Sequence, residues 1–353
     1  MIKTEEYLKD VQFLDTDFEL RGEETVHIDT NFASQSFWKD ALARFKKNKG
    51  AVVALIVIAI IVVLAIFGPH MTPYSYSDQD LSLANLAPRV QGLEDSGIFN
   101  GDEKLTTTTG IKIKNGYVID QETGEKNDVY FWLGSDTLGR DIWTRTWQGT
   151  RISLYIAVAA VLIDMIIGLS YGLISGYFGG KVDSVMQRFA EIVNSIPTLV
   201  IVTLLMLVLK PGLATITFAL MITGWIGMAR IARAQMLKLK DQEFVLASRT
   251  LGASDRMIMF QEIMPNTIGL LITNTMFSIP NAIFTEAFLS FVGLGMPEPM
   301  PSLGSMISYA FKNFTTHPYQ IVPPVIVLAV LMLCFNMLAD GLRDALDPKM
   351  KEM

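Results

Sequence analysis

Long runs of apolar residues constrain this chain more than any other feature. A helix needs about 20 mostly apolar residues to cross a hydrocarbon layer ~30 Å thick. Six runs have this length and composition, and they cover residues 51–68, 152–178, 192–209, 213–229, 267–294 and 319–339. The sequence therefore predicts an all-α integral membrane protein with six transmembrane helices, located as a multi-pass protein in the plasma or inner membrane of the cell.

The basic residues set the orientation of these helices, because short cytoplasmic loops carry an excess of Lys and Arg. Basic residues precede the first run, follow the second and the fourth, and follow the sixth. Both termini are therefore predicted to be cytoplasmic. The predicted organisation is a cytoplasmic N-terminal tail (1–50), a first transmembrane helix (51–68), an extracytoplasmic segment (69–150), a five-helix core (151–345) with a cytoplasmic loop (236–265), and a C-terminal tail (346–353).

Two segments outside the apolar runs have recognisable patterns. Residues 1–33 are acidic and predict a mobile tail. For residues 34–49 two interpretations fit: an amphipathic helix lying on the membrane lipid surface, or a basic flank that only orients the first span. In the extracytoplasmic segment, Lys114, Asn115 and Gly116 separate the runs IKI and YVI, which predicts a small excursion with a β-hairpin turning at these three residues. This excursion either caps the helices or docks an external partner.

Several kinds of chemistry have no support in the sequence. The phosphate-binding pattern GxxxxGK[ST] does not occur, and neither do HExxH and GxSxG. The single cysteine, Cys334, excludes an intrachain disulfide and a cysteine metal cluster. The net charge of −6 argues against binding nucleic acid. We therefore expect no catalytic residues, no metal site and no cofactor in this chain.

Asp164 and Glu286 are acids within apolar runs, and an ionisable residue at membrane depth is a candidate for function. They support an alternative hypothesis, a proton-coupled secondary transporter that works alone. They also fit the role of buried structural partners. A third hypothesis, an intramembrane enzyme, lacks any identifiable catalytic pair.

Residues 243–266 form a polar segment between two apolar runs, and their pattern predicts two short amphipathic helices. Gly252 is suited to end the first helix in a left-handed conformation. Ser254 or Asp255 can cap the second helix, and Pro265 is predicted to end it and to begin the fifth span. Such an L-shaped bracket either packs on itself or transmits a push from a soluble partner into the membrane.

This segment resembles the EAA motif of the permeases of ATP-binding-cassette (ABC) importers. Leu246, Ala247 and Ser248 occupy the position of the triplet, Gly252 that of the glycine, and Ile263, Met264 and Pro265 that of the ending. The resemblance extends to the C-type permease of oligopeptide and dipeptide importers through five further segments. These are WLGSDTLGRD (132–141), SGYFGGKVD (175–183), SIPTL (195–199), EAFLSFVGLG (286–295) and DGLRDALDP (340–348).

The resemblance implies a permease subunit that forms half of a peptide passage. Its implied partners are a homologous B-type permease, two ABC ATPases that bind ATP and Mg, and an extracytoplasmic substrate-binding protein. Residues 236–265 are then the coupling loop. The resemblance assigns ATPase coupling to Glu243, Ala247, Ser248, Leu251, Gly252, Ala253, Ser254, Asp255, Arg256, Ile263 and Pro265. For the translocation pathway, the candidates are Ser195, Pro197, Thr198 and Glu286; the proline is expected to kink the third span near its cytoplasmic half.

Overall fold

The computed structural model describes residues 37–94, 97, 99–107, 110–118 and 126–346. The acidic segment 1–33 and nearly all of the C-terminal tail lie outside these ranges. The predictions that concern both tails, including their cytoplasmic location, therefore remain predictions.

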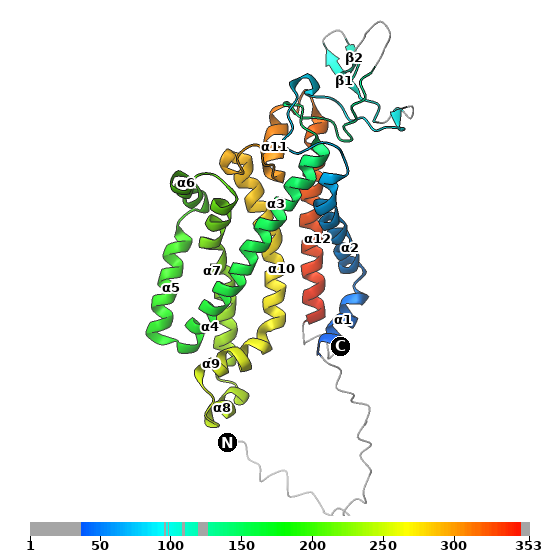
Figure 1. Ribbon diagram of the computed structural model, residues 1–353. Helices are drawn as coiled ribbons and strands as arrows, with labels where there is room; N and C mark the ends of the chain where they lie inside the picture. The colour runs from blue at the N-terminus through cyan, green and yellow to red at the C-terminus, as the bar shows by residue number, and fades with distance from the viewer. Residues whose placement is uncertain (1–36, 95–96, 98, 108–109, 119–125, 347–353) are drawn as a thin grey trace, which may run out of the picture. The chain divides into compact units, whose positions relative to one another are not determined.

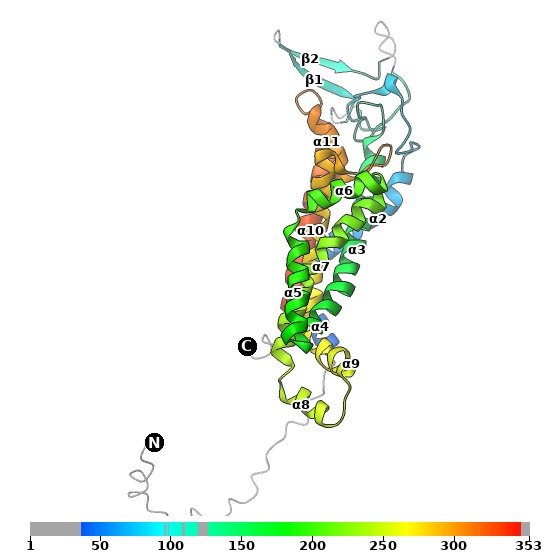
Figure 2. The ribbon, with the colours of Figure 1, turned by 90° about the vertical axis from the view of Figure 1, so that its left-hand side faces the viewer.

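Five helices are long and apolar enough to cross a membrane, and a bent pair makes a sixth (Figures 1 and 2). The first contains α2 (Lys49–Phe67), and the second contains α3 (Ile142–Ile163), a π-helical turn (Asp164–Gly168) and α4 (Leu169–Phe178). The bent pair follows, and then α7 (Leu213–Leu239). The fifth contains α9 (Asp255–Met257), two π-helical turns and α10 (Met264–Leu289), and the sixth contains α12 (Val322–Leu346). The order of the predicted spans is confirmed, with five spans as single helices and a sixth if the bent pair is one span.

The third predicted span is longer than its apolar run and is sharply bent. It is a pair of helices, α5 (Gly180–Ser195) and α6 (Thr198–Leu209), which are bent by 78° at a short break. Ile196 is extended there, because a residue that precedes proline is disfavoured in the helical region. The kink predicted at Pro197 is present, but it lies toward the end of α7 that is near α11 and not near the coupling loop (Figure 1).

The start of α5 also corrects the sequence analysis. Lys181 and Arg188, which the apolar runs had left in a loop, belong to the helix. Apolar and charged residues lie on different faces of α5 and are therefore mixed along its sequence. For this reason α5 contains no uncharged run that is long enough to identify a span. An amphipathic helix of this kind is missed when only uncharged stretches are counted.

The α4 and α7 helices pack with their backbones unusually close. Gly168, Gly172 and Gly176 are four residues apart and form one ridge against α7. A Cβ atom at Gly172 would lie 2.2 Å from the backbone oxygen of Ala229. Small residues at this spacing allow membrane helices to approach closely, so α4 and α7 form a tightly packed pair.

A second packing centre joins α2, α3, α10 and α12. Its buried residues include Ala54, Ile283, Leu331 and Leu338. The opposite face of α2 exposes apolar side chains such as Ile60, which suits a helix surrounded by lipid. The short helix α1 (Phe37–Lys47) precedes α2; from Ala41 onward, Ala41 and Phe45 are buried and Leu42 is exposed.

The segment 69–150 has a small core of its own, formed by Leu86, Tyr117 and Phe131. It contains two antiparallel strands, β1 (Asp102–Thr107) and β2 (Gly110–Asn115). The hairpin prediction was correct in kind and wrong in register, because the IKI run pairs with the residues before it and not with YVI. Asn115 begins a turn instead: its side chain accepts a hydrogen bond from the Tyr117 amide, and the buried Tyr117 ring then enters the core. The helix α11 (Leu303–Lys312) lies in the last part of the chain before α12.

Candidate functional site

The coupling loop begins with the helix α8 (Glu243–Thr250), which ends in a Schellman motif. The Ala253 amide donates to the Ser248 carbonyl at 3.1 Å, and the Gly252 amide donates to the Arg249 carbonyl at 3.0 Å. Gly252 has φ +87°, a left-handed conformation that glycine adopts without strain. The prediction that Gly252 ends the first helix is confirmed.

The second helix of the loop starts as predicted and ends differently. The Ser254 hydroxyl accepts from the Met257 amide at 3.3 Å and caps α9. The helix then continues without interruption through a π-helical turn (Ile258–Ile263) into α10, so the prediction that Pro265 ends it is wrong. Pro265 lies in the first turn of α10, directly after the π-helical turn, where the regular i→i−4 hydrogen-bond pattern is already interrupted.

The coupling loop is held firmly on its inner side. Val245 is fully buried in a cluster with Leu173 of α4 and Met236 of α7, and this cluster also contains Ile258, Met259 and Ile263. The Tyr177 hydroxyl donates to Asp255 Oδ1 at 2.5 Å. The Arg249 guanidinium lies 5.8 Å from the centre of the Tyr177 ring. A single side chain at the end of α4 therefore contacts both halves of the loop.

The turn between α4 and α5 is fixed to α7 by charged groups. Asp183 accepts two hydrogen bonds from the Arg233 guanidinium, at 2.6 and 2.5 Å. The Ser175 hydroxyl also donates to Asp183, at 2.5 Å, and the Lys240 ammonium donates to the Gly176 carbonyl at 3.1 Å. These contacts give the polar residues of the SGYFGGKVD segment a structural role. They hold the start of α5 against α7, the helix that leads into the coupling loop.

The outer side of the loop is exposed and partly apolar. Leu251 is 88% exposed, and Phe244, Leu246 and Met257 are also exposed. Most of the predicted coupling residues are on this surface: Glu243, Ala247, Leu251, Gly252, Ser254, Asp255, Arg256 and Pro265. Ser248 and Ala253 are half-buried, whereas Ile263 is fully buried in the cluster beneath. A contact role for Ile263 can only be indirect.

The two acids of the apolar runs have different surroundings. Glu286 is fully buried, and its carboxylate accepts hydrogen bonds from Ser153 at 2.7 Å and Ser290 at 2.8 Å. These contacts give Glu286 a structural role that joins α10 to α3, and they do not bring it to a surface that a passing ligand reaches. Asp164 is also buried and lies against Gly224, where a Cβ atom would come within 2.5 Å of Asp164 Oδ1.

The remaining pathway candidates lie at the break between α5 and α6. Ser195 and Pro197 are exposed and Thr198 is half-buried. The Ser195 hydroxyl donates to the Ile192 carbonyl at 2.7 Å, which satisfies the end of α5. Sequence reasoning did not identify the glycine ridge of α4, although the spacing of four between Gly168, Gly172 and Gly176 was a visible signal for close helix packing.

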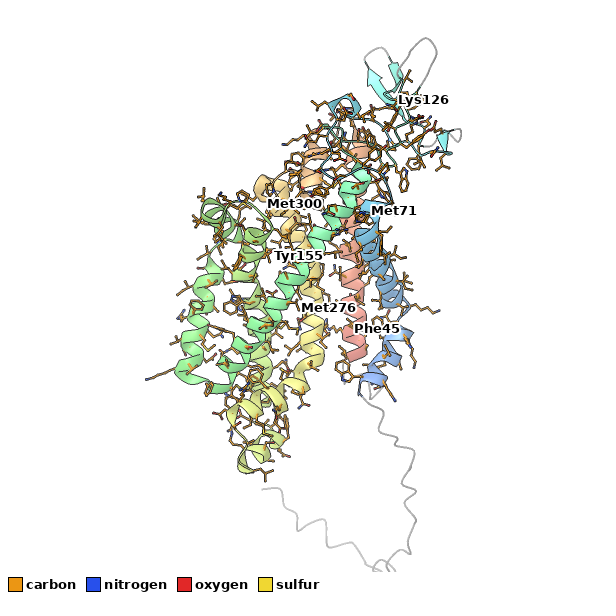
Figure 3. All side chains as sticks on the ribbon, viewed as in Figure 1. Phe45, Met71, Lys126, Tyr155, Met276 and Met300 are labelled. Atoms are coloured by element: carbon orange, nitrogen blue, oxygen red, sulfur yellow. The ribbon has the colours of Figure 1, made fainter. Side chains whose placement is uncertain are left out.

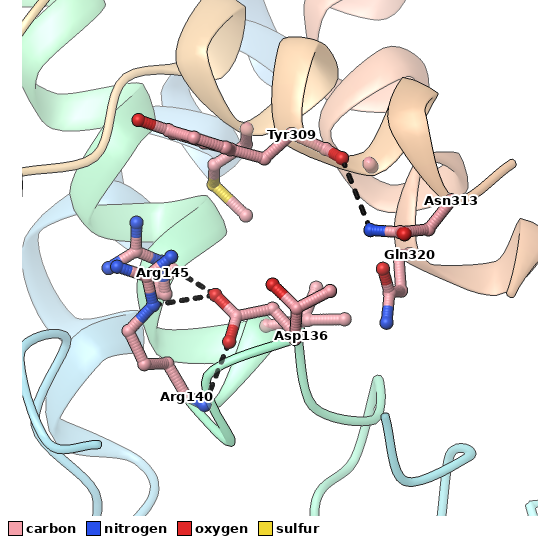
Figure 4. Close-up of a pocket in the computed structure, with 10 residues that line it drawn as sticks. Asp136, Arg140, Arg145, Tyr309, Asn313 and Gln320 are labelled. Atoms are coloured by element: carbon pink, nitrogen blue, oxygen red, sulfur yellow. Dashed lines mark hydrogen bonds and ion pairs between the residues drawn. The ribbon is translucent and has the colours of Figure 1, made fainter. Parts of the chain in front are cut away.

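An ion cluster lies at the end of α3 that is near α11 (Figure 4). Arg140 pairs with Asp136 at 2.6 Å and also with Glu298. Arg145, of which 2% of the side chain is exposed, donates to the carbonyls of Tyr76 and Pro299. This cluster accounts for Asp136 and Arg140 of the WLGSDTLGRD segment.

The same end of α3 contains a buried acid. Asp141 caps the helix by accepting from the Thr144 amide at 3.0 Å. Burial raises the pKa of Asp141, although hydrogen bonds from Thr144 and Thr72 act in the opposite direction. Within the described ranges, no group of three or more His, Cys, Asp or Glu side chains could hold a metal ion.

Comparison with known proteins identifies the family. The binding-protein-dependent transport system inner membrane component matches residues 168–352, and the N-terminal TM domain of oligopeptide transport permease C matches residues 36–88. The oligopeptide transport system permease protein OppC of Bacillus subtilis (strain 168) is 43% identical over 90% of this chain and 92% of its own. The dipeptide transport system permease protein DppC of Lactococcus lactis subsp. cremoris (strain MG1363) is 44% identical over 90% and 92%.

A more distant relative shows the same extent of similarity. OppC of Escherichia coli (strain K12) is 37% identical over 89% of this chain and 92% of its own. The family models cover the coupling loop and the first, third, fourth, fifth and sixth spans, and the matches agree with the resemblance inferred from the sequence segments. The chain belongs to the family of binding-protein-dependent transport system inner membrane components, and it is a multi-pass ABC permease of the OppC/DppC type in the inner membrane.

Proposed function

We propose that this chain forms half of the passage of an ATP-driven peptide importer, and that its coupling loop receives a movement generated by an ATP-hydrolysing partner. The observation that carries the proposal is the two-sided nature of the loop. Its inner side is buried against α4 and α7, and its outer side exposes Leu251 and other apolar residues. Exposed apolar patches of this kind mark sites of protein interaction.

The proposed partners follow from the family. A homologous B-type permease supplies the other half of the passage, and an extracytoplasmic binding protein delivers the peptide. Two ABC ATPases bind ATP and Mg and provide the energy. The names of the relatives, oligopeptide and dipeptide transport permeases, support peptides as the substrate class. We expect the chain alone to hydrolyse no ATP, since its sequence lacks a phosphate-binding loop.

The packing suggests how the movement is transmitted. Val245, Leu173 and Met236 are each fully buried, so α8 cannot shift without carrying α4 and α7 with it. Closely packed interiors transmit displacement as rigid bodies. When the ATPases close, the coupling loop moves and the membrane helices change from one arrangement to another. Binding of the peptide and of the nucleotide shifts the equilibrium between these arrangements.

The variant Leu251→Glu tests this proposal. The side chain is 88% exposed in this chain, so the substitution leaves folding intact. If Leu251 is an anchor at the ATPase interface, its loss weakens binding of the ATPases by about 2 kcal/mol or more. We expect ATP-driven peptide uptake and copurification of the ATPases to fall together in the complete transporter.

Leu81→Glu is the matched control, because Leu81 is 72% exposed but lies in the segment 69–150. It should retain both uptake and ATPase binding. The proposal is wrong if Leu251→Glu behaves like Leu81→Glu. A proton gradient that drives uptake by the chain alone, sensitive to Asp164→Asn, would instead support the secondary transporter.

A further inference from the structure

The buried acid Asp164 has a hydrogen-bonding capacity that the chain does not use. It follows α3 at the start of the π-helical turn, and only 8% of it is exposed. Its Oδ1 atom is buried and has no hydrogen-bond partner among the described residues. Glu286, the other acid of the apolar runs, accepts hydrogen bonds from two serines. Asp164 is therefore the acid that still lacks a donor.

Asp164 lies at membrane depth. In Figure 3, α3 runs from the labelled Tyr155 toward α4, and α7 packs beside this part of the chain. Asp164 is the only charged residue of the apolar run 152–178. Its neighbour on α7 is Gly224, which lies within the uncharged run 213–229, six residues or about 9 Å before Arg230. An ionisable residue at this depth is expected to have a partner.

The carboxyl group of Asp164 faces a gap in the surface of α7. Gly224 is exposed, and a Cβ atom there would lie 2.5 Å from Asp164 Oδ1 and 3.3 Å from Oδ2. The carboxyl group therefore occupies the space that a side chain at position 224 would need. Gly227 is three residues further along the same face and is also exposed, and a Cβ atom there meets no atom within 4 Å. We call the two glycines with the Asp164 carboxyl group beside them the glycine notch.

The glycine notch fits a helix of another membrane protein better than it fits lipid or a water-filled passage. Lipid chains have no hydrogen-bond donor, so they cannot satisfy Asp164. Exposed glycines let the backbone of a second helix approach closely. The neighbours of the notch on this face of α7, Met221 and Ile231, are half-buried and apolar, whereas a water-filled passage is expected to be lined by polar groups.

We propose, building on the importer function above, that the glycine notch belongs to the interface with the B-type permease, and that a helix of this subunit donates a hydrogen bond to Asp164. A hydroxyl, an amide or a basic side chain has a suitable donor. Close approach of the two backbones at Gly224 and Gly227 brings this donor within reach of the carboxyl group. The partner subunit then completes a polar contact that is left open in this chain.

The first test compares the isolated chain with the assembled permeases. Asp164→Leu replaces the acid by an apolar side chain of similar size. In the isolated chain in detergent, the unfolding temperature should stay the same or rise, because the acid has no partner to lose there. The apparent Kd between the two permeases should rise about three- to tenfold, since one hydrogen bond between spans is lost. Asp164→Asn keeps a polar group in place and should retain most of the affinity. An unchanged Kd in Asp164→Leu would overturn the proposed contact.

The second test changes the notch and leaves Asp164 intact. Gly227→Leu adds a side chain where the chain itself has free space, so the isolated protein should unfold at an unchanged temperature. The Kd for the B-type permease should rise about tenfold or more, because the added side chain overpacks the interface. Ile222→Phe is the control: Ile222 is also exposed, but it lies on the opposite side of α7 from Gly224. If both variants assemble equally well, the glycine notch is not at the interface.

The two proposals can fail separately. If the unmodified transporter imports peptides with ATP while Asp164→Leu and Gly227→Leu both assemble normally, the interface assignment is wrong and the importer function stands. A higher KM of Asp164→Leu for peptides with a free amino terminus would then place the acid in the passage. If both variants weaken association of the permeases but the unmodified transporter imports no peptide, the importer function is wrong and the interface stands.

Discussion

The two ends of the membrane helices differ in which side chains are buried and which are exposed. Near α11, charged groups are buried and paired: Arg140 and Arg145 are each 2% exposed and contact Asp136 and Glu298. At the coupling loop, apolar side chains are exposed, and Leu251 reaches 88%. Near α11, the buried charged groups find their partners within the chain. At the coupling loop, the exposed apolar surface has no such partner among the described residues, and we expect another protein to cover it.

This difference predicts which substitutions affect folding and which affect transport. The largest loss of stability is expected for Arg145→Leu, because the variant removes a buried guanidinium that lies 3.7 Å from both Asp136 and Glu298 and donates to the carbonyls of Tyr76 and Pro299. Removing one member of a buried pair costs roughly 3 kcal/mol or more. Thermal unfolding of the purified protein in detergent measures this loss. Arg188→Leu removes the same group from an 82% exposed position and should change the stability by less than about 1 kcal/mol. If the two variants lost similar amounts of stability, the proposed difference between buried and exposed arginines would be wrong.

A smaller loss is expected where α4 meets α7. In Gly172→Ala, the added methyl group would lie 2.2 Å from the Ala229 carbonyl oxygen, so the two helices have to separate. Overpacking of this kind costs about 1–3 kcal/mol. Gly227→Ala is the matched control on α7, because a Cβ atom there meets no atom within 4 Å. Comparable unfolding temperatures for the two variants would show that close approach of α4 and α7 is dispensable.

The smallest effect on stability is expected for Tyr177→Phe, which removes the hydrogen bond to Asp255 at 2.5 Å and a long one from Arg249 at 3.5 Å. We expect a loss of about 0.5–1.5 kcal/mol. The ratio of peptide uptake to ATP hydrolysis in the complete transporter should fall further than the unfolding temperature suggests, because Tyr177 links the turn after α4 to the coupling loop. Asp255→Asn keeps an acceptor at the same place and should retain most of this ratio. An unchanged ratio in Tyr177→Phe would show that the contact plays no part in coupling.

Local patterns in the sequence predicted several features correctly. The apolar runs identified the spans, Gly252 identified the end of α8, and Ser254 identified the cap of α9. Each of these depends on residues that are adjacent or within one helical turn. Sequence reasoning was therefore reliable where the determining contacts were local.

Features that depend on distant contacts were missed or placed wrongly. The length of α5 was missed because charged residues interrupt its apolar positions, and Ala190 contacts residues of α7 that are 35 or more positions away along the chain. The register of β1 and β2 depends on which earlier residues pair with the IKI run. The two serine partners of Glu286, one of them 133 residues away along the chain, could not be identified from the sequence, and its place in the pathway stays a prediction.

The central claim is that the exposed face of the coupling loop is covered by an ATP-hydrolysing partner. Leu251→Cys in the Cys334→Ala background tests it most directly, through the rate of thiol labelling in membranes with and without the ATPase subunits. We predict rapid labelling of the permease alone and strong protection once the ATPases are present, while Leu81→Cys labels equally in both. Labelling of Leu251→Cys at the same rate in both membranes would contradict the account.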